Sequence, residues 1–176
     1  KKNINSSDNL EKFIAKLWDL GLQVGHSVRT IKDIKKIAKE DPKEFTSYLT
    51  RRPLLTNKKT DESINLALSK IWSKKKFYKV KLSEQEERYK SFFSTEYNLE
   101  PNLKESPGTL RDFQTSLWIL QHCFDLENID GIKKSKEFGN EIEEVINSYN
   151  FVKTMRYITN IISNKNRLTF EIQVEI

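Results

Sequence analysis

Residues 140–163 read NEIEEVINSYNFVKTMRYITNIIS and form the longest helical pattern of the chain. Their apolar residues recur every three or four positions, so they share one face of a helix. This face carries Ile142, Val145, Ile146, Tyr149, Val152, Met155, Ile158 and Ile162. Other helices must cover an apolar face of this length. The stretch therefore predicts the core helix of a helical bundle.

Helix caps and apolar spacing predict further helices upstream. They are expected over residues 109–124, 77–93 and 61–72, from the Asp41-Pro42 cap to about Pro53, and over residues 33–39. The run SKKKFYKVK at residues 73–81 mixes cations with aromatics, as in proteins that bind single strands of nucleic acid. Its helical spacing nevertheless favours lysines that face water. Trp18, Trp72 and Trp118 fall on apolar faces and are expected in the core.

The first 30 residues predict one helix and one strand. Ser7 or Asp8 can cap the helix and Gly21 can end it. Its apolar face would carry Leu10, Phe13, Ile14, Leu17 and Trp18. Apolar and polar residues then alternate over residues 22–29, which is typical of a strand. The expected fold is mainly α, a helical bundle preceded by a helix and a strand.

Composition narrows the classes of function. The 176 residues include 31 Lys and Arg against 25 Asp and Glu, and the net charge of +6 favours acidic partners. Cys123 is the single cysteine, so an internal disulfide is excluded and a reducing cytoplasm fits. His26 and His122 lie too far apart in sequence for a zinc signature. No apolar run approaches the roughly 18 residues that a membrane span needs, so we expect no membrane partner.

Two stretches resemble one enzyme family. They are LWDLGLQVGHSVRT at residues 17–30 and KFYKVKLSEQEERYKSFFSTEYNLEPNLKESPGTLRDFQTSLWIL at residues 76–120. Both are similar to the bifunctional uridylyltransferase and uridylyl-removing enzyme that modifies the nitrogen-signalling protein PII. ISNKNRLTFEIQ at residues 162–173 resembles the end of that family's helical domain. The pattern around YNLEPN and PGTLRDF is long and irregular, so chance explains it poorly.

The resemblance implies a place within a longer enzyme. The family begins with a polymerase-beta-like α/β nucleotidyltransferase fold, whose Asp-x-Asp strand binds metal ions and the phosphates of UTP, and continues with a helical domain. Residues 1–30 would be the C-terminal part of the first domain and residues 31–176 the helical domain. UTP and PII would be the partners and Mg²⁺ the cofactor. No Asp-x-Asp occurs in the chain, so the catalytic and metal-binding residues are expected outside it and the chain alone is expected to be inactive.

Three positions depart from the family pattern. Gln23 stands where relatives usually have Glu, and a tolerated substitution beside the metal site is favoured over a weakened site. Thr109 replaces a second Gly and suits a helix N-cap. Arg51 stands where an acid is usual, which inverts the local charge and leaves the role of that segment open.

The resemblance and the residue types together indicate candidate binding residues for UTP or PII. Lys104 and Arg111 offer cations to a triphosphate or to an acidic surface of PII, while Asn98 and Asn102 offer amides. Glu100 could orient one of the cations. A structural alternative stays open, in which Pro101, Pro107 and Gly108 shape a rigid connection and Arg111 pairs with Asp112 at a helix start.

Two more candidates follow the first helix. Arg29 could bind phosphate because its planar guanidinium can grip two oxygens. His26 could lie near the nucleotide, although an ordinary hydrogen-bonded histidine is the favoured interpretation. A rival function from another class is a basic helical module that binds nucleic acid or a protein partner. Nucleic acid is disfavoured, and the rival would show a steep loss of affinity with salt.

Overall fold

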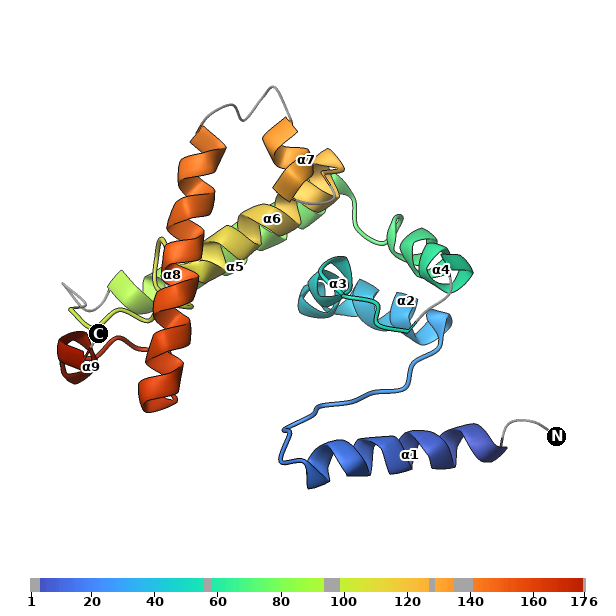
Figure 1. Ribbon diagram of the computed structural model, residues 1–176. Coiled ribbons are helices and arrows are strands. Elements are labelled where there is room, and N and C mark those ends of the chain that lie inside the picture. Colours follow the sequence, from blue (N-terminus) through green and yellow to red (C-terminus); the bar gives the residue numbers. More distant parts are fainter. Residues whose placement is uncertain (1–3, 56–57, 94–98, 127–128, 135–140, 176) are drawn as a thin grey trace.

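The computed structural model describes residues 4–55, 58–93, 99–126, 129–134 and 141–175. These residues form nine helices and no strand (Figure 1). The mainly α fold is therefore confirmed. The helices are α1 (Ile4–Asp19), α2 (Ile31–Glu40), α3 (Pro42–Leu49), α4 (Lys58–Leu68), α5 (Lys74–Phe93), α6 (Leu110–Phe124), α7 (Ile129–Lys134), α8 (Glu141–Ser163) and α9 (Phe170–Glu175).

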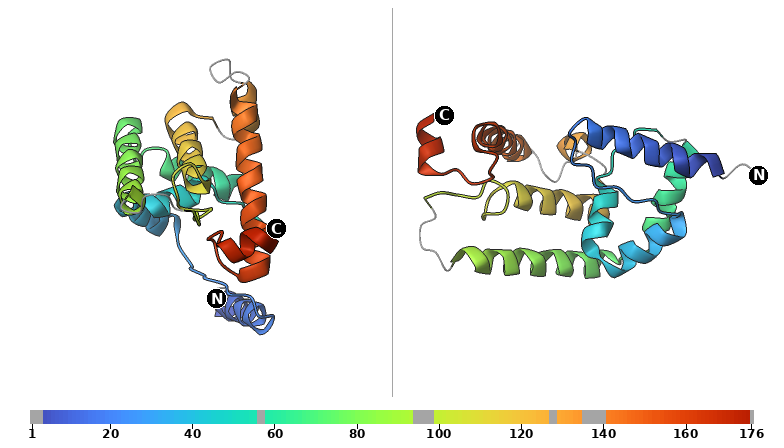
Figure 2. Two further views of the ribbon diagram at one scale, coloured as in Figure 1. Left: turned by 90° about the vertical axis from the view of Figure 1, so that its left-hand side faces the viewer. Right: turned by 90° about the horizontal axis from the view of Figure 1, so that it is seen from below.

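The helices fall into two groups with α1 apart from both. The long helices α5 and α6 lie side by side, and α8 crosses α6 (Figures 1 and 2). The short helices α2, α3 and α4 pack together, and α3 also contacts α6. An extended segment after residue 20 carries α1 away from these helices (Figure 2). No helix of the described ranges is long and apolar enough to cross a membrane.

The core lies where α2, α3, α4 and α5 meet. Its buried residues are Ile34, Ala38, Phe45, Leu68, Trp72 and Phe77. The rings of Phe45 and Phe77 meet edge to face at a centroid distance of 5.4 Å. Trp72 is buried as predicted, and its indole N–H donates to the Ala38 carbonyl at 2.9 Å. Each fully buried aromatic side chain contributes roughly 1.5–3 kcal/mol through the water it excludes.

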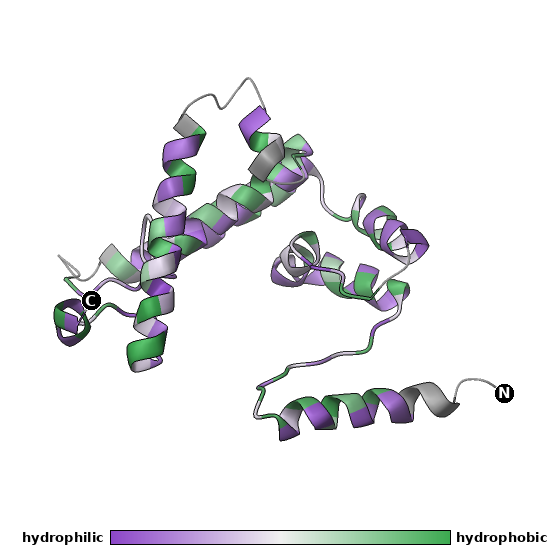
Figure 3. Cartoon of the chain, viewed as in Figure 1, coloured by the Kyte–Doolittle hydropathy of each residue, from purple (hydrophilic) through white to green (hydrophobic). Residues whose placement is uncertain are grey.

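The prediction that α8 is the core helix is wrong in part. Ile146 is buried, but Val145 and Ile162 are 47% and 40% exposed. The helix meets α6 through the rings of Phe113 and Tyr149, which stack at 3.9 Å. An apolar cavity of about 710 Å³ separates the two helices beside this contact. Only part of the apolar face of α8 is therefore covered, and apolar residues remain along its length (Figure 3).

The first 30 residues differ from expectation in two ways. Residues 22–30 are extended but pair with no other segment of the described chain, so the predicted strand is wrong. A strand needs a neighbour for its backbone hydrogen bonds. Trp18 is 53% exposed instead of buried, and its indole N–H donates to the Val24 carbonyl at 3.2 Å. Ile14 of α1 is buried, and Gly21 ends the helix with a φ of 76°, as predicted.

Most helix starts follow local capping. Asp41 caps α3 by accepting from the backbone N–H of Lys43, as predicted. The α2 helix begins earlier than expected, at a capping box of Thr30 and Asp33. Thr109 is the N-cap residue of α6, but its hydroxyl donates back to the Ser106 carbonyl and makes no cap bond.

Two other helices also begin earlier than the local signals predict. The α1 helix begins at Ile4, so Ser7 and Asp8 lie within it, and α4 begins at Lys58 and ends at Leu68. Asp61 thus lies in the first turn of α4, where its carboxylate accepts from Arg51 at 2.5 Å. Arg51 also donates to Asn65 at 2.6 Å. The unusual arginine therefore joins the end of α3 to α4.

Candidate functional site

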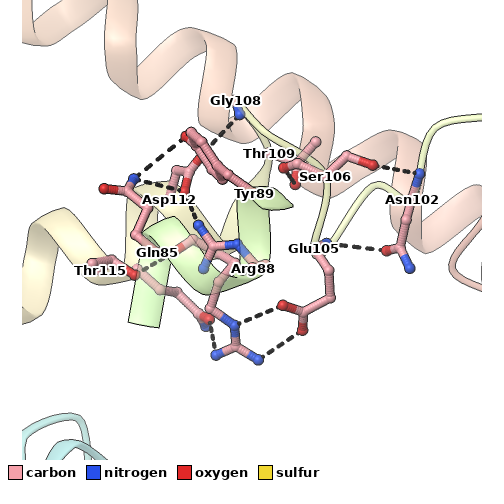
Figure 4. Close-up of polar contacts among 12 residues, drawn as sticks. Gln85, Arg88, Tyr89, Asn102, Glu105, Ser106, Gly108, Thr109, Asp112 and Thr115 are labelled. Atoms are coloured by element: carbon pink, nitrogen blue, oxygen red, sulfur yellow. Dashed lines mark hydrogen bonds and ion pairs between the residues drawn. The ribbon is translucent and has the colours of Figure 1, made fainter. Parts of the chain in front are cut away.

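The Asp112 carboxylate ties α5 to α6 and to the loop before α6. It accepts from Gln85 Nε2 at 3.0 Å, from the Tyr89 hydroxyl at 2.6 Å and from the backbone N–H of Gly108 at 2.6 Å. It also pairs with the Arg88 guanidinium (Figure 4). Burial and the bond to Asp112 raise the pKa of Tyr89. Four donors on one carboxylate make a rigid joint between the helices.

Arg111 pairs with Glu105 and not with its neighbour Asp112, so the Arg111–Asp112 pair of the structural alternative does not form. Adjacent residues on a helix point in different directions, which separates the two side chains. Arg111 Nε and Nη2 donate to the Glu105 carboxylate at 3.2 and 2.9 Å, and Nη1 donates to Gln114 at 3.0 Å. Lys104 Nζ lies 3.5 Å from the same carboxylate. The hydrogen bonds that Glu105 accepts from Arg111 are the main cause of the lowered pKa of Glu105.

The loop at residues 99–109 is folded by its own side chains. Asn102 Oδ1 accepts from the backbone N–H groups of Lys104 and Glu105 at 3.0 and 3.1 Å (Figure 4). Glu100 accepts from the backbone N–H of Phe170 at 3.0 Å, so it attaches the loop to the start of α9. Glu100 therefore accepts from a backbone N–H at the start of α9 and does not orient a cation of the described chain. Asn98 lies outside the described residues.

The two candidates that follow α1, Arg29 and His26, contact protein side chains away from this loop. Arg29 donates to the Glu44 carboxylate at 2.6 and 3.3 Å and to the Tyr48 hydroxyl at 2.7 Å. These bonds, above all those that Arg29 donates to Glu44, raise the pKa of Arg29. They also occupy the guanidinium N–H groups that were predicted to bind phosphate. The imidazole of His26 is exposed and lies 5.6 Å from the Trp18 ring. Among the predicted residues, the structure therefore brings together Lys104 and Arg111.

A cavity of about 760 Å³ opens beside this pair, between α3, α5 and α6. Its charged lining consists of Lys43, Lys81, Glu84, Glu87, Arg88, Glu105 and Arg111. Thr46, Ser47, Thr50, Gln114 and Trp118 supply the remaining lining. The cavity thus offers donors and acceptors from three helices and one loop.

Lys81 is the member of this lining that the sequence analysis missed. It is 1% exposed, so its assignment to a face in water is wrong. Its ammonium donates to Glu84 at 2.8 Å and lies 5.0 Å from the centre of the Trp118 ring. Position 81 lies one helical turn after the buried Phe77, and that spacing was the available signal for an inward side chain.

No group of three or more His, Cys, Asp or Glu residues that could hold a metal ion occurs in the part of the chain that the structure describes. Two of the three acids that line the cavity are paired with cations, Glu84 with Lys81 and Glu105 with Arg111. These residues do not fit a magnesium site.

The sequence that contains this site matches one known protein family. Residues 76–176 match the family described as GlnD PII-uridylyltransferase. The chain is 33% identical over 174 residues to a bifunctional uridylyltransferase/uridylyl-removing enzyme of Haemophilus influenzae. It is 33% and 35% identical, each over 178 residues, to proteins of the same name from Hydrogenovibrio crunogenus and Idiomarina loihiensis.

These alignments cover 96%, 98% and 95% of this chain but only 20% of each relative. The chain therefore spans about one fifth of the length of the relatives that it matches. No solved structure matches it significantly.

Proposed function

The chain belongs to the GlnD PII-uridylyltransferase family, and from that membership we propose that it is a helical region of an enzyme that transfers UMP from UTP to a tyrosine of PII. The names of its relatives, which cover almost the whole chain, support this proposal. Within it, residues 1–30 are the C-terminal part of the nucleotidyltransferase domain and residues 31–176 are the helical domain. The cytoplasm, which supplies UTP, is the proposed setting.

The convergence of Lys104 and Arg111 on Glu105 carries the residue-level part of the proposal. All three side chains are partly exposed and lie in the segment that matches the family. A carboxylate between two cations holds both in place while each keeps donors for a further acceptor. The cations can then meet the triphosphate of UTP or an acidic surface of PII.

The test is made in a complete enzyme that contains this region. Replacing both cations, Lys104→Gln with Arg111→Gln, is expected to lower the rate of UMP transfer by about tenfold or more, the effect of losing one charge-assisted hydrogen bond. The melting temperature should change little, because partly exposed ion pairs contribute only about 0–1 kcal/mol to folding. Label transferred to PII and thermal unfolding are measured on the same samples.

Glu105→Gln is the matched control because it breaks the same ion pairs and keeps both cations. It should lower the transfer rate much less than the double variant does if the cations serve UTP or PII, because both cations remain. Equal losses of activity in Glu105→Gln and in the double variant would mean that the pair only shapes the loop. The functional assignment of Lys104 and Arg111 would then be withdrawn.

Magnesium belongs to the proposal only through residues outside the chain. Transfer of a nucleotidyl group uses metal ions held by carboxylates to neutralise the departing pyrophosphate. Since the described residues do not fit such a site, no step of the reaction is assigned to a metal on this chain.

A further inference from the structure

Two residues that line the cavity between α3, α5 and α6 each carry a buried N–H donor that finds no acceptor among the described residues. The donors are Trp118 Nε1 and Arg88 Nε. A buried donor without a partner is costly, so native proteins leave few of them, and an unseen water or ion commonly explains those that remain. Because both residues line one cavity, a single ligand bound there is the simplest acceptor for both donors.

The other two tryptophans provide an internal comparison. The indole N–H of Trp18 donates to the Val24 carbonyl at 3.2 Å, and that of Trp72 donates to the Ala38 carbonyl at 2.9 Å. Even the half-exposed Trp18 thus has a protein acceptor. The lack of an acceptor is therefore specific to the Trp118 indole N–H and is not a general feature of the tryptophans in this protein.

The spare N–H donors around the cavity favour an anion as that acceptor. Four cations and three glutamates line it, and Asp112 outside the lining pairs with Arg88, so the fixed charges are close to balance. Lys81 has three N–H donors, and Glu84 is the acceptor that the described residues provide. A buried ammonium with donors to spare favours a ligand that carries negative charge and several oxygens.

We propose that this cavity binds a phosphate-type oxyanion, with donors from Trp118, Arg88 and Lys81 and with Arg111 at its edge. The proposed function enters only as the source of the ligand, which is the phosphoryl group of a nucleotide or free pyrophosphate. Neither orphan nitrogen reaches solvent, so a partly exposed neighbour such as Arg111 or Glu84 has to move aside. That rearrangement costs free energy and therefore predicts weak binding.

The indole N–H resonances of this 176-residue chain, recorded by nitrogen-15 NMR, provide the test. Pyrophosphate is added at constant ionic strength, with sodium chloride as the balancing salt. The Trp118 resonance should shift along a saturating curve, while the resonances of Trp18 and Trp72 should stay in place. If Trp118 does not move, or all three resonances move alike, the proposal is overturned.

Single substitutions test whether the Trp118 N–H itself binds the anion. Trp118→Phe removes the N–H, keeps an aromatic ring and assigns the resonance. Its affinity for pyrophosphate, measured by calorimetry, should fall by about tenfold, the effect of one charge-assisted hydrogen bond. Arg111→Gln should also weaken binding, whereas Lys79→Gln, on the exposed face of α5, should not. Unchanged affinity in both Trp118→Phe and Arg111→Gln would overturn the proposal, and Arg111→Gln decides alone if Trp118→Phe does not fold.

Titrations with different ligands show whether the site takes the phosphoryl group of a nucleotide or free pyrophosphate. They also test this site independently of the proposed function. Uridine, which has no phosphate, should leave Trp118 unmoved, and a shift as large as that with pyrophosphate would overturn the proposal. A shift with both pyrophosphate and UTP indicates a site for phosphoryl groups in general, and a shift with pyrophosphate alone indicates the free ion. The assay contains no PII, so a failed titration removes the oxyanion site and leaves UMP transfer by the complete enzyme to its own test.

Discussion

At the scale of single residues, the His122 imidazole links α6 to the core. One ring nitrogen lies 2.9 Å from the Trp72 carbonyl, and the ring meets those of Phe45 and Phe77 at 5.0 and 4.8 Å. Burial among these rings lowers the pKa of His122 below its ordinary value of 6.5. The neutral ring is therefore the form that the fold favours.

The sign of the resulting pH dependence follows from proton binding. Below pH 6.5 the unfolded chain protonates His122 while the folded chain resists, so the unfolded state binds more protons. The free energy of unfolding should be unaffected by His122 above that pH and should decrease as the pH falls toward the lowered pKa. The slope is at most about 1.4 kcal/mol per pH unit, the value for one proton.

Chemical denaturation between neutral pH and pH 5 measures this slope. His122→Gln should flatten it, and His26→Gln, which changes the exposed histidine, should leave it as it is. The carboxyl groups with lowered pKa, Asp33 and Glu105, respond at more acidic pH than this window. An equal slope in His122→Gln and the unaltered chain would contradict the assignment.

At the scale of elements, the Asp112 carboxylate sets how α5 lies on α6. Arg88 and Asp112 are 13% and 16% exposed, so both charges are largely removed from water. Asp112→Asn keeps the shape of the side chain and leaves the Arg88 charge without its partner. Because breaking a buried pair costs about 3–5 kcal/mol and this one retains some exposure, we expect a loss near the lower end, about 3 kcal/mol of unfolding free energy.

Asp125→Asn is the matched control for this measurement. Asp125 ends α6 in a left-handed conformation that Asn also adopts readily, and its ion pair with Lys74 is exposed. Its replacement should change the free energy of unfolding by no more than about 1 kcal/mol. Similar losses of unfolding free energy in Asp112→Asn and Asp125→Asn would contradict the claim that the Asp112 contacts stabilise the packing of α5 on α6.

At the scale of the whole molecule, the chain provides a helical body with an outlying helix. Large apolar side chains on and after α1 are exposed, among them Phe13, Trp18, Leu20, Leu22 and Val28. The described residues also lack a carboxylate cluster for a metal. On the proposed function, residues outside this chain cover the apolar face and supply the catalytic carboxylates.

We therefore expect the chain alone to transfer no UMP. With magnesium, UTP and PII present, labelled PII should not exceed a blank without protein, because no Asp-x-Asp, the pair that the proposal assigns to the metal ions, occurs in the sequence. A complete relative serves as the positive control. Label transfer by this chain above the blank would contradict the proposed division of the enzyme.

The sequence by itself determined the helical class and several helix boundaries. Gly21 ends α1 and Asp41 caps α3 as expected, because these features depend on backbone groups within a few residues of the cap. Trp72 is buried as expected, although it lies between α4 and α5 and not on the predicted helix. The resemblance of residues 76–120 to one family was also readable, because a long irregular motif does not depend on how the chain folds.

Only the tertiary structure decided which residues from distant segments meet. Lys81 lies in a lysine-rich run that indicates a surface, yet Trp118 and Glu84 cover it. Arg111 could have paired with its neighbour Asp112, but Asp112 is held by Arg88 and Tyr89 of α5, and Arg111 pairs with Glu105. Alternation over residues 22–29 indicates a strand, but strand pairing requires a second segment at hydrogen-bonding distance. Partners, burial and cavities depend on contacts between helices, and local patterns of residues do not specify those contacts.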